Sequence, residues 1–393
     1  MSLVRRLWQP SSVRSADVVA DTLALVRHGT PTHAGATVSP DSAMRLAAVW
    51  ACVRLLADIV SSLPVDCYRR TPDGDVEIDP PMLLQRPSAL VGWTGWIYQT
   101  MVSLLLRGNA FGLVTETSTG LPSRIEILNP DDVTVTQQRP LEPVEFRWRG
   151  SPIPADRVWH LPAFQMPGVP VGLSPVTYAR QSIGLGLSSE EFGARWFGDG
   201  AHPTGTLSTD QQVTGDQAEI VKQRFIDSTS SSRAPVVLGA GLKWEPIQVS
   251  PDESQFLDTQ RWTVTQICRV FGVPPEMVGA APDGAGSLTY ANREQRSMDL
   301  LQYTVQPWLT RLEEAVSALL PKPRRIKFCV DALLRADLKT RYEAHKIGIS
   351  SGFLTPNEAR SLEDLPPLPG GDMPPTPSSA PTPEEVVPDV PNT

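Results

Sequence analysis

The spacing of apolar residues along the chain predicts four long helices. In each of these stretches apolar side chains recur every three or four residues, which is typical of a helix with one buried face. Two of the stretches would form rods of about 35 and 31 Å at ~1.5 Å per residue, similar enough to act as a pair. The predicted helices cover residues 40–63, 175–197, 251–271 and 288–320.

Residue choice within these helices adds detail to the prediction. The first places one apolar stripe on its surface and ends before Pro64. In the last, Pro307 lacks the N–H group that would bond to the carbonyl of Tyr303, which predicts a kink there. The stripe on the first helix consists of Leu46, Trp50, Val53, Ala57 and Val60.

Ser or Thr followed at once by Pro marks four predicted helix starts. The hydroxyl can accept a free backbone N–H, and proline has the right φ angle for the first helical position. Glu253 and Glu358 would complete capping boxes at the last two of these starts. The four pairs are Ser39-Pro40, Ser174-Pro175, Ser250-Pro251 and Thr355-Pro356.

Short alternating runs between the first two long helices predict strands. Turn signals at Pro72-Asp73-Gly74 and Thr119-Gly120 separate pairs of these runs, as in hairpins. Together with a helix over residues 93–107, the strands predict a mixed α+β unit that ends near Phe164. The runs cover residues 65–70, 76–78, 111–117, 123–128, 133–138, 144–148 and 157–161.

A small β-α-β-β pattern of about fifty residues lies between the two predicted rods. A unit of this size buries too little apolar surface to be stable alone, so we expect it to pack against neighbours, a first indication of an oligomer. Near the end of the chain, residues 324–330 predict a strand and residues 333–352 a helix. From Leu365 onward there are ten prolines and no Lys or Arg, which predicts a disordered acidic tail.

Composition narrows the function classes. The 393 residues carry a net charge of −8, from 43 acidic and 35 basic residues, so tight static binding of nucleic acid is disfavoured. The uncharged run 89–106 contains Gly92, Gln99 and Ser103 and favours a packed amphipathic helix over a membrane span. The first residues lack a signal-peptide pattern. Four distant cysteines, at 52, 67, 268 and 329, predict reduced and partly buried thiols, with no disulfide or zinc site.

One motif resembles that of an enzyme. The string LALVRHGTPTHAG is similar to the opening motif of the histidine-phosphatase family, which would make His28 the nucleophile and Arg27 a phosphate clamp. The similarity covers about six residues, and no second His or Arg follows in a comparable context. An exposed N-terminal segment is the alternative interpretation of the same residues.

A glycine-rich loop precedes the last long helix. Residues 279–287 read GAAPDGAGS, and a phosphate site at a helix N-terminus normally includes a Lys or Arg. Here Asp283 stands instead of a base. The composition favours a flexible exposed loop over a phosphate cradle.

Several longer stretches together resemble one family, the portal proteins of tailed bacteriophages, in the branch named after phage HK97. They follow the family's order over residues 40–372. The stretches are AVWACVRLLADIVSSLPVDCYRR (48–70), LLLRGNAFGLV (104–114), GLSPVTYARQSIGLGLSSEEFGARWFGDGAHPTG (172–205), FLDTQRWTVTQICRVFGVPPEMVG (256–279) and LLRADLKTRYEAHKIGISSGFLTPNEARSLEDLPPLPGGD (333–372).

The resemblance implies an α+β portal fold that forms a ring and is not an enzyme. The ring, usually a dodecamer, stands at one capsid vertex, through which the terminase drives DNA and to which connector and tail attach. The implied parts are an N-terminal extension (1–39), wing (40–171), first stem helix (172–200), clip (201–249), second stem helix (250–278), tunnel loop (279–287), inner wing and crown (288–364) and tail (365–393).

The same resemblance implies sites and partners. The tunnel loop would face DNA through Gly279, Pro282, Asp283, Gly284, Gly286 and Ser287. Arg293 and Arg296 would touch phosphates or pair with Glu294 or a neighbouring subunit's acid. Lys222, Arg224 and Arg233 would lie on the clip rim that meets the terminase large subunit or connector, or be ordinary solvated charges.

Further implied partners are other copies of the chain, double-stranded DNA and a major capsid or scaffold protein. No cofactor, metal or membrane is implied. The protein would belong to the virion and to the host cytoplasm during assembly. The main structural alternative is another capsid or head-tail adaptor protein.

Overall fold

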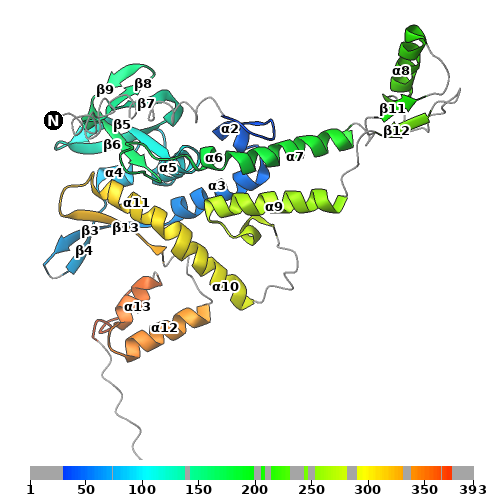
Figure 1. The fold of residues 1–393 in the computed structure, drawn as a ribbon. Coiled ribbons are helices and arrows are strands. Elements are labelled where there is room, and N and C mark those ends of the chain that lie inside the picture. Colours follow the sequence, from blue (N-terminus) through cyan, green and yellow to red (C-terminus); the bar gives the residue numbers. More distant parts are fainter. Residues whose placement is uncertain are drawn as a thin grey trace, which may run out of the picture. The chain divides into compact units, whose positions relative to one another are not determined.

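The computed structural model describes residues 30–72, 74–137, 142–198, 205–208, 214–230, 243–246, 253–280, 290–330, 338–363 and 365–373. The chain divides into two compact units, Met1–Phe328 and Cys329–Thr393. Antiparallel sheets and helices are mixed in the first unit, which confirms the α+β class (Figure 1).

A helical layer forms the centre of the first unit. Helix α3 (Ala47–Ser62) packs against α5 (Trp93–Arg107) and α9 (Glu253–Phe271). These contacts bury apolar side chains completely, and such burial stabilises a fold by about 25 cal/mol per Å² of apolar surface removed from water. The side chains that lose all solvent contact include Val49, Cys52, Leu56, Ile97, Met101, Leu104 and Ile267.

The first predicted helix is two helices. α2 (Pro40–Ala43) has a capping box between Ser39 and Ser42, and α3 begins only after Leu46. Leu46 is the N-cap of α3 and has an extended backbone, with φ −77° and ψ 120°. The predicted apolar stripe is wrong at Trp50, whose surface is 50% exposed.

Strands from the two ends of the first unit form one sheet. β3 (Val65–Thr71) pairs with β4 (Gly74–Ile78) and with β13 (Arg324–Phe328), all antiparallel. β13 is an edge strand, and side chains of α11 accept the N–H groups that face away from β3. Ser317 Oγ accepts from Ile326 N at 3.0 Å, and Glu313 Oε1 accepts from Phe328 N at 2.8 Å.

Two further three-stranded sheets pack on each other. The first has the order β10-β5-β6 and the second β7-β8-β9. Their shared core contains Phe111, Leu128, Val133 and Val135. The strands are β5 (Asn109–Ser118), β6 (Leu121–Leu128), β7 (Val133–Thr136), β8 (Glu145–Trp148), β9 (Ser151–Ile153) and β10 (Val158–Pro162), and the short helices nearby are α4 (Met82–Gln85), η1 (Pro130–Asp132) and η2 (Ala155–Arg157).

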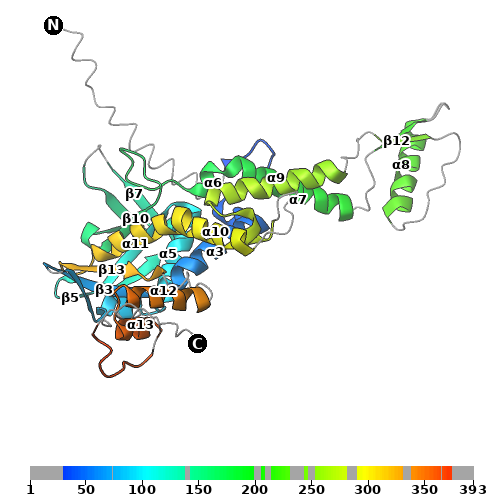
Figure 2. The same ribbon diagram turned by 90° about the horizontal axis from the view of Figure 1, so that it is seen from below.

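The two predicted rods form an antiparallel pair. Figures 1 and 2 show α7 (Arg180–Gly198) beside α9 (Glu253–Phe271), and each has 19 residues. The rod predicted to begin at Pro175 is interrupted, because α6 (Pro175–Tyr178) ends at Tyr178 and Ala179 separates it from α7. The prediction that the two helices are similar in length is confirmed.

The long helix before the end of the first unit contains a π-helical segment. α10 (Tyr290–Asp299) continues through η4 (Leu300–Val305), a π-helix, into α11 (Gln306–Ser317). Pro307 lies in the first turn of α11. The π turns lie just before it, where the proline N–H is missing, and such turns are a recognised site of helix distortion, so the irregularity predicted near Pro307 is present.

The inserted unit consists of β11 (Gly205–Ser208), α8 (Gly215–Ser230) and β12 (Lys243–Pro246). β11 and β12 pair antiparallel, with Leu207 opposite Trp244. None of the side chains whose burial is described in this unit is buried. The predicted strand at 234–239 lies outside the described residues.

The second compact unit contains α12 (Leu338–Ser350) and α13 (Pro356–Leu362). The predicted capping box is confirmed, since Thr355 Oγ1 accepts from Glu358 N at 3.2 Å and Glu358 Oε2 accepts from Thr355 N at 2.7 Å.

The start of the proline-rich tail is ordered, contrary to prediction. Asn357 Nδ2 donates to the carbonyl of Leu368 at 3.0 Å and to Asp372 Oδ1 at 2.7 Å, while Asn357 Oδ1 accepts from Leu368 N at 2.8 Å. A buried asparagine thus supplies hydrogen bonds that a proline-rich segment cannot form with itself. The predicted tail beyond Met373 lies outside the described residues.

Candidate functional site

Two glycines let α7 pack closely against its neighbours. A Cβ atom on Gly184 would lie 2.5 Å from the side chain of Thr32, and one on Gly186 would lie 2.8 Å from Leu46 and 3.0 Å from Thr263. Real Cβ atoms essentially never lie as close as at Gly184, and at Gly186 the neighbouring side chains would have to shift, so glycine suits both positions. The GLGL sequence therefore holds α7 tightly between α9 and the N-terminal hairpin.

The N-terminal hairpin packs against the first half of α7 through hydrogen bonds. β1 (Thr30–Pro31) and β2 (Thr37–Val38) form it. His33 N donates to Gln181 Oε1 at 3.1 Å, and Ser188 Oγ donates to the carbonyl of Ala34 at 2.9 Å. The described part of the predicted N-terminal extension, residues 30–39, therefore packs on the helix.

The α+β body is joined to α6 through a tight backbone crossing. Ser174 Oγ accepts from Thr177 N at 3.2 Å as the N-cap of α6, and donates to the carbonyl of Leu106 at 2.7 Å. Gly108 ends α5 with φ +70°, and a Cβ there would lie 2.1 Å from the carbonyl oxygen of Leu173. The quoted RGNAFG and GLSP stretches are therefore the two sides of one junction.

Asn109 is the polar centre of this junction. Its Nδ2 donates to the carbonyls of Arg107 and Gly172 at 3.1 and 2.9 Å, and its Oδ1 accepts from Gly172 N at 2.7 Å. Asn109 Oδ1 also lies 3.0 Å from Nε2 of His160. Because Oδ1 can only accept, His160 donates through Nε2.

The surroundings of His160 keep it uncharged. Its ring stacks on Phe111 with 4.5 Å between centroids and meets Phe146 edge-on at 5.8 Å. Burial lowers the pKa of His160 to about 4, because the imidazolium would lose its hydration. The contacts that the structure gives for this histidine are all within the junction.

The base of the predicted tunnel loop is fixed by an ion pair. Gly279 follows η3 (Pro275–Val278) with φ +81°, in the left-handed region that glycine favours. Glu276 of η3 pairs with Arg296 of α10, so the segments on either side of the loop are held together. Glu276 is a partner of Arg296 that was not predicted from the sequence, and contact of Arg296 with phosphates or with a neighbouring subunit stays a prediction.

The remaining residues predicted for the loop lie outside the described part of the chain. These are Pro282, Asp283, Gly284, Gly286 and Ser287. Arg293 falls within α10, but its side chain is also outside the described set. Their contact with DNA stays a prediction.

Two of the three basic residues predicted for the clip rim, Lys222 and Arg224, lie on α8. Lys222 Nζ lies 3.3 Å from Glu219 Oε1, one turn earlier on the helix, and both side chains are largely exposed. Arg224 is exposed. Arg233 lies outside the described residues. The pair at Lys222 fits a solvated helix face, and contact with a partner protein stays a prediction.

Two cysteines that are far apart in sequence meet in the core. Cys52 Sγ of α3 lies 3.9 Å from Cys268 Sγ of α9, and both are fully buried. The hydrogen bond to Cys268, together with burial, raises the pKa of the Cys52 thiol, which is therefore protonated. Cys67 is buried and Cys329 partly exposed, and all four thiols are free.

The described residues contain neither a metal-binding cluster nor a membrane-spanning helix. No group of three or more His, Cys, Asp or Glu side chains there is arranged to hold a metal ion. No helix in the same part of the chain is both long and apolar enough to cross a bilayer. The predicted phosphatase residues, Arg27 and His28, lie outside it.

Comparisons with known proteins agree on one family. The family model described as phage portal protein matches residues 47–364. A relative named probable portal protein, from Streptomyces phage phiC31, is 31% identical over 87% of this chain and 79% of its own length.

Two solved structures share the fold. An HK97 family phage portal protein from Corynebacterium diphtheriae has a TM-score of 0.60 at 16% identity, over 75% of this chain and 96% of that one. A chain from the neck of a native gene transfer agent particle, computed with C12 symmetry, has a TM-score of 0.55 at 22% identity, over 91% and 100%. The extent of the family match, together with the phiC31 relative, places this chain in the phage portal protein family.

Proposed function

We propose that twelve copies of this chain form a closed ring that serves as the channel for double-stranded DNA at one vertex of a phage capsid. The observation that carries the proposal is the antiparallel helix pair α7 and α9, locked onto an α+β body and interrupted by a small inserted unit, in a member of the portal family. The C12 symmetry of the gene transfer agent neck supports the subunit number.

The parts of the ring subunit follow from this assignment. Residues 40–171 would form the wing, 172–200 and 250–278 the two stem helices, 201–249 the clip, and 279–287 the tunnel loop. Residues 288–364 would form the inner wing and crown. The contacts between the proposed stem and the body support this division. The N-terminal hairpin, the glycines of α7 and the junction around Asn109 attach α7 firmly to the body.

The charge of the chain supports a conduit that lets DNA slide. Basic residues along a channel bind phosphates by releasing counterions, and many such contacts would resist movement. The chain has a net charge of −8, and Arg296 is neutralised by Glu276 of its own chain. The ring would act without enzymatic activity, while the terminase supplies the work.

Partners follow from the position of a portal in the particle. The terminase large subunit and a head-tail connector would bind the clip rim, near Lys222, Arg224 and Arg233. A major capsid or scaffold protein would bind the wing. The ring would belong to the virion after assembly in the host cytoplasm.

Mass photometry of the purified chain tests the ring directly. A discrete species near twelve times the mass of the chain is expected, with no hydrolysis of p-nitrophenyl phosphate. A stable monomer that hydrolyses this substrate, and loses the activity on His28→Ala, would overturn the proposal and favour the phosphatase interpretation.

Shortening residues 279–287 tests the role of the loop. Because Glu276 and Arg296 hold its base, we expect rings of the shortened variant to assemble normally. DNA packaging or retention in assembled heads should fall at least tenfold. Normal packaging by the variant would show that the segment is only a linker.

A further inference from the structure

Cys52 of α3 and Cys268 of α9 form a thiol pair inside the first unit. Cys52 Sγ donates a hydrogen bond to Cys268 Sγ, and neither side chain has any exposed surface. Their sulfur atoms lie 3.9 Å apart, and an S–S bond is about 2.0 Å long, so each sulfur needs to move by only about 1 Å. Rotation of the two side chains about their Cα–Cβ bonds provides a movement of this size. The pair is therefore close enough for a covalent bond between the helices.

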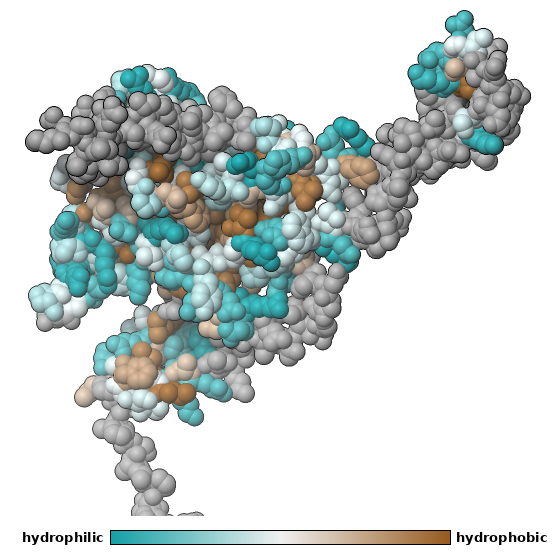
Figure 3. Space-filling view, in the orientation of Figure 1, coloured by the Kyte–Doolittle hydropathy of each residue, from teal (hydrophilic) through white to brown (hydrophobic). Residues whose placement is uncertain are grey.

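The surroundings of the pair are apolar. Val49, Leu56 and Ile267, from the same two helices, are also completely buried. Figure 3 shows brown, hydrophobic residues at the surface where the end of α9 lies in Figure 1. A thiol buried among apolar groups keeps its proton, whereas the thiolate is the form that reacts. Reaction of the pair therefore needs brief local openings of the fold.

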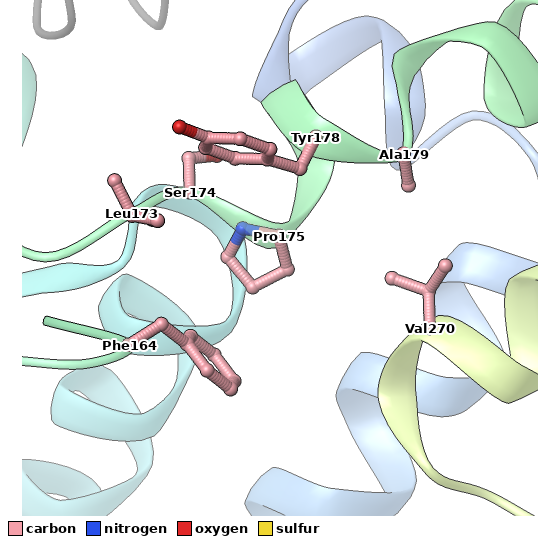
Figure 4. Close-up of a pocket in the computed structure, with 7 residues that line it drawn as sticks. All are labelled: Phe164, Leu173, Ser174, Pro175, Tyr178, Ala179 and Val270. Carbon is pink, nitrogen blue, oxygen red and sulfur yellow. The ribbon is translucent and has the colours of Figure 1, made fainter. Parts of the chain in front are cut away.

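The end of α9 has an open side at which such openings can start. Val270, two residues after Cys268, lies on roughly the opposite side of the helix, because each residue turns the helix by about 100°. It is 40% exposed and lines an apolar cavity of about 330 Å³. Figure 4 shows the open space between Val270, Pro175 and the ring of Phe164. The last turn of α9 thus meets α3 through Cys268 and borders a cavity through Val270.

We propose that Cys52 and Cys268 form an intrachain disulfide bond that fastens the end of α9 to α3. The two residues are 216 positions apart, and the segment between them contains α5, two of the sheets, α7 and the inserted unit. A cross-link that closes so long a loop strongly restricts the unfolded chain and so stabilises the folded one. The structure holds the reduced form, in which all four thiols are free.

The time at which the bond forms rests on the proposed function. Disulfides are rare in a reducing cytosol and persist in oxidising surroundings, which include the surface of virions. A portal assembled in the host cytoplasm would keep both thiols. The bond would therefore form after assembly, when the particle has left the cell.

The reaction balances with a small-molecule disulfide, R–S–S–R, as the oxidant. The hydrogen bond from Cys52 lowers the pKa of Cys268, which favours Cys268 as the attacking thiolate. Its Sγ bonds to one sulfur of the oxidant and releases R–S⁻. Cys52 then loses its proton, attacks Sγ of Cys268 and releases the second R–S⁻. The chain gives up two electrons and two protons, and two molecules of R–SH form.

Thiol counting by mass spectrometry tests the bond. The purified chain is incubated with 2-hydroxyethyl disulfide, unfolded in urea and alkylated with iodoacetamide without reduction. Two of the four thiols should escape alkylation, and digestion should give a cross-linked peptide that joins Cys52 to Cys268. Four alkylated thiols, a mixed disulfide with the reagent or a cross-link between two chains would overturn the inference.

Thermal unfolding tests the effect of the bond on stability. Oxidation should raise the midpoint for the wild type by at least about 5 °C, because the cross-link restricts the unfolded chain. Cys67→Ala removes a buried cysteine outside the pair and should show the same rise, whereas Cys52→Ala and Cys268→Ala should show none. Equal midpoints for oxidised and reduced wild type would overturn the inference. If the two pair variants do not fold, the wild-type midpoints and thiol count decide.

Comparison of cell-bound and released particles tests the time of bond formation. Infected cells alkylated before lysis should yield the chain with four modified thiols, and particles from the medium should yield it with the Cys52–Cys268 bond. Absence of the bond from released particles would overturn the inference even where the chain forms rings. A purified chain that forms the bond but no rings would support the bond and overturn the proposed function.

Discussion

The junction around Asn109 and the inserted unit carrying α8 are built on opposite principles. At the junction, Asn109 makes hydrogen bonds to Arg107, Gly172 and His160, and the neighbouring helices bury large apolar side chains completely. In the inserted unit none of the side chains with described burial is buried. The contacts within the body are therefore sufficient to stabilise its fold, whereas we expect the stability of the insert to depend on contacts with other subunits or proteins.

This difference matches the tasks proposed for the two regions. A stem formed by α7 and α9 needs a firm attachment to the body, and the junction provides it. A rim that meets a terminase and later a connector must present charged groups that remain accessible, and α8 does so with Lys222 and Arg224. Stability changes should therefore be large in the junction and small in the insert.

The largest effect is expected from Gly108→Val. A Cβ at this position would lie 2.1 Å from the carbonyl oxygen of Leu173, and φ is +70°. The free energy of unfolding should fall by about 4 kcal/mol or more, as for other changes that strain a special backbone position. Denaturant unfolding followed by circular dichroism measures it.

A glycine of the insert is the matched control. Nothing lies within 4 Å of the position that a Cβ on Gly215 would take, at the start of α8. Gly215→Ala should leave the unfolding free energy unchanged or raise it by at most about 1 kcal/mol. A large loss of unfolding free energy in Gly215→Ala, or no loss in Gly108→Val, would contradict the contrast between a rigid junction and a loosely packed insert.

Acid should weaken the junction through His160. Its pKa in the folded state is about 4, below the ordinary value of about 6.5, so the unfolded chain binds the proton more readily. The contribution of neutral His160 is fully present above pH 6.5 and is lost as the pH falls toward 4. The loss reaches about 3 kcal/mol, at ~1.36 kcal/mol per pKa unit.

A variant without the titrating ring isolates this contribution. His160→Gln keeps an amide donor for Asn109 but cannot titrate, so its unfolding free energy should vary less between pH 6.5 and 4 than that of the wild type. Chemical denaturation at half-unit steps of pH measures both proteins. Parallel curves would show that His160 is not buried as a neutral ring.

The smallest effect is expected at Lys222 of the insert. Its pair with Glu219 is largely exposed, and such pairs contribute about 0–1 kcal/mol. Lys222→Ala should therefore change the unfolding free energy by less than about 0.5 kcal/mol. Loss of terminase or connector binding by this stable variant would assign Lys222 to the rim, and unchanged binding would leave it an ordinary solvated charge.

Local signals in the sequence predicted much of the fold. The caps at Ser39, Ser174 and Thr355 are present because they depend only on a hydroxyl and the next few residues. The similar lengths of α7 and α9 and most of the hairpin strands followed from apolar spacing in the same way.

Contacts between distant residues escaped prediction. β13 joins the sheet of β3 and β4 across some 250 residues, and Cys52 meets Cys268 across 216. The break at Ala179 and the hydrogen bonds of Asn357 to the tail likewise depend on partners that apolar spacing cannot identify. Among the predicted site residues, the pairing of Arg296 also escaped prediction, because its partner Glu276 lies on the other side of the loop.

Electron microscopy of the purified chain in negative stain tests the central claim most directly. The proposal predicts end-on views of closed rings with a central hole and a single symmetry near twelvefold. A uniform population of monomers, with no ring and no central hole, would contradict it.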